Sequence, residues 1–221
     1  MVARGRETPN PELYPQRIVR ESIPDWEHYT RQHLRKGFPI LNEIDEVLDV
    51  LVSSSDWSEV YGYEPKPHTE GSMCSLRRWA IKAMMLSEED IYLNQLLQLP
   101  EDATRQHQYA HKNIVPVIYF CLKPYSLVMP LYMGGTLEGY IACLRTHFIW
   151  EQEKHKIVSL LLGVAEALAH LSNQSPHNIL IHRAIIPSNI LLEGDTPRLT
   201  DFRLAIEEFK WPCDCVGDSH R

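Results

Sequence analysis

Residues 180–204 read LIHRAIIPSNILLEGDTPRLTDFRL and carry two largely polar triplets separated by short apolar runs. The stretch opens with the triplet His182-Arg183-Ala184 and closes with the triplet Asp201-Phe202-Arg203. Asn189 lies between them, five residues after the alanine. Asn189 and Asp201 carry amide and carboxylate oxygens, which are the ligands that Mg²⁺ prefers in proteins.

Four further fragments precede this stretch in a fixed order: Ala80-Ile81-Lys82, His111-Lys112-Asn113-Ile114-Val115, Leu127-Val128-Met129 and Gly134-Gly135-Thr136-Leu137. In its order the whole set resembles the protein kinase family, whose catalytic centre combines His-Arg-Asp, a following Asn and Asp-Phe-Gly. The resemblance covers residues from about 60 to 221. It implies an α+β, protein-kinase-like fold, with an antiparallel sheet plus a helix in the small lobe and the start of a helical large lobe.

The resemblance assigns nucleotide and metal roles to eight positions. Lys82 resembles the lysine that holds the α- and β-phosphates of ATP, and Asn189 and Asp201 resemble the two Mg²⁺ ligands. The other five positions are expected to surround the adenine: Ala80, Leu191, the gatekeeper Met129, and Pro130 and Tyr132 of the hinge. Weak, magnesium-dependent binding of ATP is therefore expected.

Three departures from the family pattern weaken the catalytic chemistry. Ala184 stands where the family has its catalytic aspartate, so no side chain there accepts the proton of an acceptor hydroxyl. Ile186 replaces a phosphate-contacting lysine. Arg203 replaces the glycine of Asp-Phe-Gly and adds a cation able to pair with Asp201.

These departures make the chain resemble a pseudokinase, a catalytically impaired signalling module that acts as a regulator or scaffold. Two alternatives stay open. One is a low-activity, ATP-dependent protein kinase that phosphorylates Ser, Thr or Tyr. The other is a truncated isoform or fragment without independent activity, since the resemblance stops in the activation segment.

The glycine-rich loop is degenerate under either of two placements. By pattern it lies at 69–76, where only the middle glycine, Gly71, is kept. By spacing it belongs near Gly62 to Pro65, because two strands and a turn need about a dozen positions before Lys82.

A helix is expected over 88–99, and Pro100 is expected to end it. Asp102 or the adjacent Glu101 is then the candidate ion-pair partner of Lys82. A solvated turn or helix start at these two acidic residues is an equally compatible interpretation.

The chain divides into an N-terminal extension, 1–59, and a kinase-like domain, 60–221. Four prolines among polar residues predict a flexible arm over 1–24. Residues 25–53 are expected to form an amphipathic helix that needs an apolar partner, because large apolar residues recur there at helical spacing: Ile40, Ile44, Val47, Leu48 and Leu51.

The apolar residues of 153–171 predict a second helix whose face has no covering helix in the chain: Ile157, Leu161, Val164, Leu168 and Leu171. A protein partner is expected on this face and on the N-terminal helix. A net charge of -7 gives no basic footprint for nucleic acid, so no nucleic-acid partner is expected. Without a long apolar run or a signal peptide, no membrane span is expected, and a cytoplasmic location is predicted.

Overall fold

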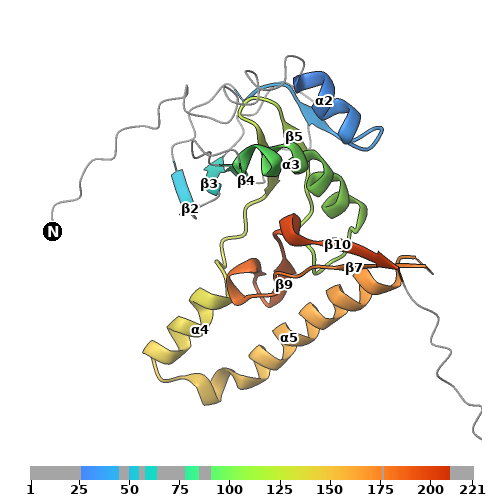
Figure 1. The fold of residues 1–221 in the computed structure, drawn as a ribbon. Coiled ribbons are helices and arrows are strands. Elements are labelled where there is room, and N and C mark those ends of the chain that lie inside the picture. The colour runs from blue at the N-terminus through green and yellow to red at the C-terminus, as the bar shows by residue number, and fades with distance from the viewer. Residues whose placement is uncertain are drawn as a thin grey trace, which may run out of the picture. The chain divides into compact units, whose positions relative to one another are not determined.

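A computed structural model describes residues 26–44, 50–54, 58–63, 78–84, 91–175 and 177–209 (Figure 1). Its contacts divide the chain into two compact units. The first, which we call the sheet unit, comprises Met1–Ala110 and Val115–Tyr132. The second, the helical unit, comprises His111–Ile114 and Met133–Arg221.

The sheet unit is built on a six-stranded sheet with the strand order β1-β5-β6-β4-β3-β2. Its strands are β1 (Ile40–Leu41), β2 (Val50–Ser54), β3 (Ser58–Tyr63), β4 (Trp79–Met84), β5 (Tyr119–Cys121) and β6 (Ser126–Pro130). Neighbouring strands run antiparallel except for the parallel pair β1 and β5. The expected α+β architecture with an antiparallel sheet is confirmed.

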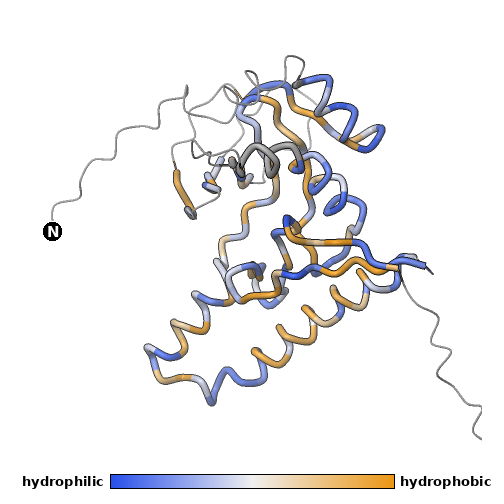
Figure 2. The backbone as a smooth tube through the Cα atoms, viewed as in Figure 1, coloured by the Kyte–Doolittle hydropathy of each residue, from blue (hydrophilic) through white to orange (hydrophobic). Residues whose placement is uncertain are grey.

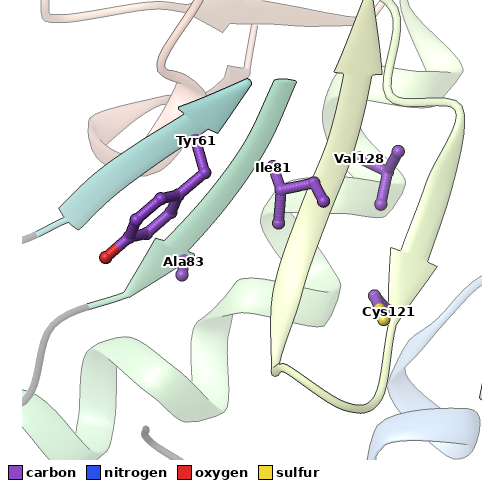
Figure 3. Packing of buried hydrophobic residues seen from close by; sticks show 5 residues of the cluster. All are labelled: Tyr61, Ile81, Ala83, Cys121 and Val128. Atoms are coloured by element: carbon purple, nitrogen blue, oxygen red, sulfur yellow. The ribbon is translucent and has the colours of Figure 1, made fainter. Parts of the chain in front are cut away.

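Alternation along β4 determines which side chains enter the core of the sheet unit. Successive residues of a strand point to opposite faces, so Ile81 and Ala83 share one face while Ala80 and Lys82 share the other. Ile81 and Ala83 pack in a buried cluster with Tyr61, Cys121 and Val128 (Figure 3). The residues expected to meet a nucleotide therefore lie on the face opposite this cluster.

The structure corrects the amphipathic helix predicted over 25–53. A helix, α2, spans only Trp26–His33, whereas Ile40 and Leu51 lie in strands β1 and β2. Val47 and Leu48 are outside the described residues, as are 1–24. Strands β2 and β3 pair with each other across the division expected at residue 59, so the sheet uses residues from both parts of the chain.

Helix α3 (Ile91–Gln108) is longer than the sequence predicted, because Pro100 lies inside it and does not end it. Proline removes one backbone N–H donor from a helix and crowds the preceding turn, but tertiary packing outweighs that cost here. Leu99, Pro100 and Ala103 are buried. The solvated turn considered for Glu101 and Asp102 is therefore wrong, since both residues are helical.

The helical unit contains α4 (Leu137–Thr146) and α5 (Trp150–Asn173), followed by two small antiparallel sheets. One sheet pairs β7 (Asn178–Ile181) with β10 (Ile206–Phe209), and the other pairs β8 (Ile190–Glu193) with β9 (Thr196–Leu199). Two 3₁₀ turns, η2 (Pro187–Asn189) and η3 (Phe202–Leu204), complete the loops. Thr136 begins α4 by accepting a hydrogen bond from the backbone N–H of Gly139.

The apolar face of α5 divides into a buried part and an exposed part. Figure 2 shows apolar residues along much of this helix. The helix packs against β7 and β9, so Ile157, Val164 and Leu171 are buried, and the prediction that they lack an intrachain partner is wrong. The exposed large apolar residues of α5 beyond its first turn are Val158, Leu161 and Leu162. Among the described residues, no helix is long and apolar enough to cross a bilayer.

Candidate functional site

A buried histidine organises the loop after β7. His182 is 1% exposed, and its Nε2 lies 3.1 Å from the carbonyl oxygen of Thr200. A carbonyl only accepts, so Nε2 carries the proton, and Nδ1 accepts the backbone N–H of Ala184 at 3.3 Å. Burial lowers the pKa of His182, in keeping with this neutral tautomer. The ring also packs edge-on against Phe202, 4.6 Å away.

Asn189 closes the same loop from its other end. Its Nδ2 donates to the carbonyl oxygen of Ala184 at 3.0 Å, and its backbone carbonyl accepts the N–H of Thr200 at 3.0 Å. Three segments that are apart in sequence, at 182–184, 189 and 200, are thereby held together. The sequence placed these residues in one frame through their resemblance to the kinase family, and their hydrogen bonds were not predicted.

The chemically decisive position within this frame is Ala184. Its backbone makes both loop hydrogen bonds, while its side chain is a methyl group that neither accepts nor donates a proton. Ile186, in the position of the family lysine, is half exposed and equally apolar. The loop is formed, and at positions 184 and 186 it presents a methyl group and an apolar side chain.

Asp201 adopts a left-handed backbone conformation, with φ of 67° and ψ of 70°. Arg183 is left-handed too, at φ 64°. Such conformations cost about 1–3 kcal/mol for non-glycine residues, and they persist where the surroundings determine them, often at functional sites. Arg203, by contrast, lies in η3 without a positive φ, so loss of the family glycine causes no backbone strain there. Pairing of Arg203 with Asp201 stays a prediction.

The oxygen donors of the helical unit fit a magnesium ion. The Nδ2 atom of Asn189 is engaged by Ala184, which leaves Oδ1 as the amide atom for a cation. Asp201 adds a carboxylate, and both are hard oxygen ligands of the kind that Mg²⁺ takes together with water. Leu191, the expected adenine contact, is half buried on β8 and bridges to Thr136.

The sheet unit aligns the other candidate residues on two paired strands. Ala80 lies opposite Met129 and Lys82 opposite Leu127 in the register of β4 and β6, so all four share the face away from the core cluster. Met129 and Ala80 are buried, and Lys82 is half buried. Pro130 ends β6, and the N–H of Leu131 bonds the carbonyl of Arg78 at 2.9 Å. Tyr132 is half buried at the end of the unit.

Of the two acidic candidates on α3, the structure buries Asp102 and exposes Glu101. Asp102 accepts a hydrogen bond from Nη1 of Arg105 at 3.0 Å, one turn along the helix. Its burial makes it the better candidate to pair with Lys82, and that pairing stays a prediction.

Of the two expected positions of the glycine-rich loop, the structure describes only the start of the one near Gly62. Gly62 lies inside β3, paired with Val50 and Ala80, and the 69–76 placement lies outside the described residues. Strands β2 and β3 pair with each other in the sheet.

Comparison with known proteins points to one family. The family model described as "Protein tyrosine and serine/threonine kinase" matches residues 54–211. The chain is 24% identical to Probable serine/threonine-protein kinase roco9 of Dictyostelium discoideum, over 82% of this chain and 6% of that protein.

Two more relatives agree. An L-type lectin-domain containing receptor kinase IV.1 of Arabidopsis thaliana is 33% identical over 43% of this chain and 14% of its own length. Tyrosine-protein kinase Fer of Rattus norvegicus is 25% identical over 76% of this chain and 19% of its own length. The chain thus spans less than a fifth of the length of each of these three relatives.

Proposed function

This chain belongs to the protein tyrosine and serine/threonine kinase family, and from that premise we propose that it is a catalytically impaired member that acts as a regulator or scaffold. The kinase-like α+β fold expected from the sequence agrees with this membership. The chain's remaining chemistry, on this proposal, is weak binding of ATP.

One observation carries the proposal. The loop around His182 is held by three hydrogen bonds between side chains and the backbone, yet the side chain of residue 184 is only a methyl group. Phosphoryl transfer requires a carboxylate that orients the acceptor hydroxyl and takes its proton. Loss of such a group costs about 10²- to 10⁴-fold in rate, and Ile186 removes a phosphate contact as well.

The retained residues support nucleotide binding more than catalysis. Lys82 offers an ammonium group for phosphate oxygens, and the apolar side chains of Ala80 and Met129, paired on β4 and β6, are of the kind that contacts a purine. Asn189 Oδ1 and Asp201 would hold Mg²⁺, which neutralises phosphate charge when bound. The Pro130 carbonyl and the Tyr132 backbone are the proposed partners of the adenine edge.

A partner protein is the proposed target of regulation. Val158, Leu161 and Leu162 recur at helical spacing on α5 and are 65%, 52% and 60% exposed. Exposed apolar surface of this kind marks interaction sites. Location in the cytoplasm stays a prediction from the sequence.

Two assays with one variant test the proposal. Saturating ATP with Mg²⁺ is expected to raise the melting temperature of the wild-type chain, since a ligand of the folded state stabilises it by RT ln(1 + [L]/Kd). A radiometric phosphotransfer assay is expected to give only background. Lys82→Met should remove the thermal shift, whereas Lys154→Met, at an exposed lysine of α5, should keep it. Phosphotransfer that disappears in Lys82→Met would contradict impaired catalysis.

A low-activity kinase is the second candidate, and a specific observation favours it. Lys82, Asn189 and Asp201 are all kept, and the frame that orients Asn189 is formed. Measurable transfer that depends on all three residues would select this alternative.

A further inference from the structure

The described segment 26–44, which comprises α2, β1 and the residues around them, lies against both helix α3 and the sheet. It contains three of the buried side chains of the sheet unit: Thr30, Leu34 and Phe38. Helix α2 packs on α3, and β1 adds to the edge of the sheet beside β5 (Figure 1). The segment is therefore an integral part of the sheet unit.

Two contacts join this segment to α3. The backbone N–H of Arg35 donates to Oγ1 of Thr104 at 3.1 Å. The ring of Phe38 packs at 4.8 Å from the ring of His107, with an interplanar angle of 55°. Thr104 and His107 are one turn apart, so both contacts fall on the same side of the helix.

The same segment is tied to the sheet by backbone hydrogen bonds. The N–H of Phe120 donates to the carbonyl of Pro39 at 3.0 Å, and the N–H of Leu122 donates to that of Leu41 at 2.9 Å. The N–H of Ile44 donates to the carbonyl of Lys123 at 2.8 Å. The hydroxyls of Thr30 and Tyr125, both buried, lie 3.3 Å apart.

Helix α3 has a weak point close to these contacts. Pro100 removes one backbone N–H from the helical ladder. After it, Gln106 Nε2 donates to the carbonyl of Val115 at 2.7 Å, and the His107 ring donates to that of Val117 at 3.0 Å. Asp102 lies between the proline and the first contact with the N-terminal segment.

We propose that residues 26–44 form a brace that fixes the second half of α3 against the sheet and thereby holds Asp102 in its buried position. The brace connects Thr104 and His107 to the β5–β6 hairpin through Arg35, Phe38 and the β1 ladder. Its effect on ATP binding rests on the proposed function, because it acts through the predicted pair of Asp102 and Lys82.

Hydrogen exchange on the full chain tests the brace without any ligand. Phe38→Ala removes the ring contact, and Thr104→Val removes the acceptor of the Arg35 N–H while keeping the side-chain shape. Each variant is expected to increase the exchange rate of the amides at 101–108 by about tenfold. The reason is that each loses one hydrogen bond or one packed ring that opposes local opening of the helix. Amides of β6 should keep their wild-type rates.

Matched controls come from the helical unit. Phe148→Ala makes the same truncation at a side chain that is 90% exposed. Thr146→Val removes a hydroxyl bonded only within α4, to the carbonyl of Ala142. Both controls should leave exchange at 101–108 unchanged.

Three results would overturn the brace: unchanged exchange at 101–108 in folded Phe38→Ala, an equal rise in β6 and α3, or an equal effect of the control variants. If Phe38→Ala fails to fold, Thr104→Val decides the matter by the same criteria.

A second measurement follows ATP binding, where the brace variants are expected to bind about tenfold more weakly than wild type. Absence of any ATP response in the wild-type chain would refute the proposed function, and the exchange rates would still decide the brace.

Discussion

Asn189 Nδ2 donates a hydrogen bond to the carbonyl oxygen of Ala184 at 3.0 Å, so the side chain of Asn189 closes the loop onto the backbone of residue 184. The bond does not depend on the side chain at 184. His182 is held in the same way, through the Ala184 N–H and the Thr200 carbonyl. The hydrogen bonds that hold this loop thus use only the backbone of residue 184.

The first prediction concerns restoration of the missing carboxylate. Ala184→Asp is expected to fold, because both loop hydrogen bonds use the backbone of residue 184. It should still show no phosphotransfer above background, since Ile186 supplies no cation for the phosphate. Radiometric autophosphorylation of Ala184→Asp beside wild type is the measurement. A gain of activity from this single change would show that the carboxylate was the only missing part.

The second prediction concerns magnesium. Asp201→Asn is expected to reduce the ATP-induced thermal shift measured with Mg²⁺ to the smaller value measured with EDTA, because the carboxylate is the charged member of the ligand pair. Asp195→Asn, at an exposed aspartate that pairs with Lys156, is the matched control. An equally large shift with and without Mg²⁺ in wild type would exclude Asn189 and Asp201 as metal ligands.

The third prediction concerns acid. Burial lowers the pKa of His182 and of His111 below the ordinary value of 6.5, so the unfolded chain binds more protons than the folded chain in that range. The contribution of these two neutral histidines to the free energy of unfolding is therefore complete above about pH 6.5. It decreases as the pH falls below that value. His111 stacks on His170 at 4.7 Å, and its Nδ1 accepts the Asn113 N–H, so protonation opposes both contacts.

Urea unfolding at several pH values measures this dependence. His111→Gln should flatten the fall in stability below pH 6.5, while His155→Gln, at an exposed position of α5, should leave it unchanged. An identical slope in His111→Gln and wild type would mean that His111 does not contribute.

The fourth prediction compares two helical glycines. A Cβ at Gly163 would lie 2.6 Å from Pro197 Cγ and 2.9 Å from Asn113 Nδ2, whereas at Gly139 it would meet only Thr136 Oγ1 at 3.6 Å. Gly163→Ala is therefore expected to destabilise the chain by about 1–3 kcal/mol, as overpacking does. Gly139→Ala should be neutral or stabilising by up to about 1 kcal/mol, because alanine favours helix. Equal melting temperatures for the two variants would contradict the close packing of α5 on β9.

The resemblance of the motifs at 182–203 to the kinase family, which rests on their order and spacing, was sufficient to predict the α+β fold. The same resemblance assigned Ala80, Lys82 and Met129 to a nucleotide site, but their common face on the paired strands β4 and β6 was not predicted. The hydrogen bond from the Ala184 N–H to His182 Nδ1 depends on the backbone conformation between them, including the left-handed Arg183. No pattern of residue types predicts that conformation directly.

The failures have equally specific causes. Ile40 and Leu51 recur at helical spacing with other apolar residues, yet both pair in the sheet, so tertiary pairing outweighed the periodicity. Pro100 was expected to end its helix. The helix instead continues through Pro100 to Gln108, and the nearby Leu99 and Ala103 are buried. The apolar face of α5 was expected to need other helices as packing partners, whereas strands β7 and β9 pack against it.

The fifth prediction concerns the part of α5 that these strands leave exposed. Val158, Leu161 and Leu162 lie within one turn of each other, opposite the buried residues Leu160 and Val164. We expect the wild-type chain to self-associate with increasing concentration through this surface, because burial of each such side chain contributes about 1.5–3 kcal/mol.

Leu161→Gln with Leu162→Gln should lower the sedimentation-derived mass toward that of a monomer while the helical circular dichroism stays constant, since neither side chain supports the intrachain core. The pair Val50→Gln and Val52→Gln, on the exposed strand β2, serves as a control for general surface polarity. A wild-type chain that stays monomeric at high concentration would mean that this surface is not self-adhesive.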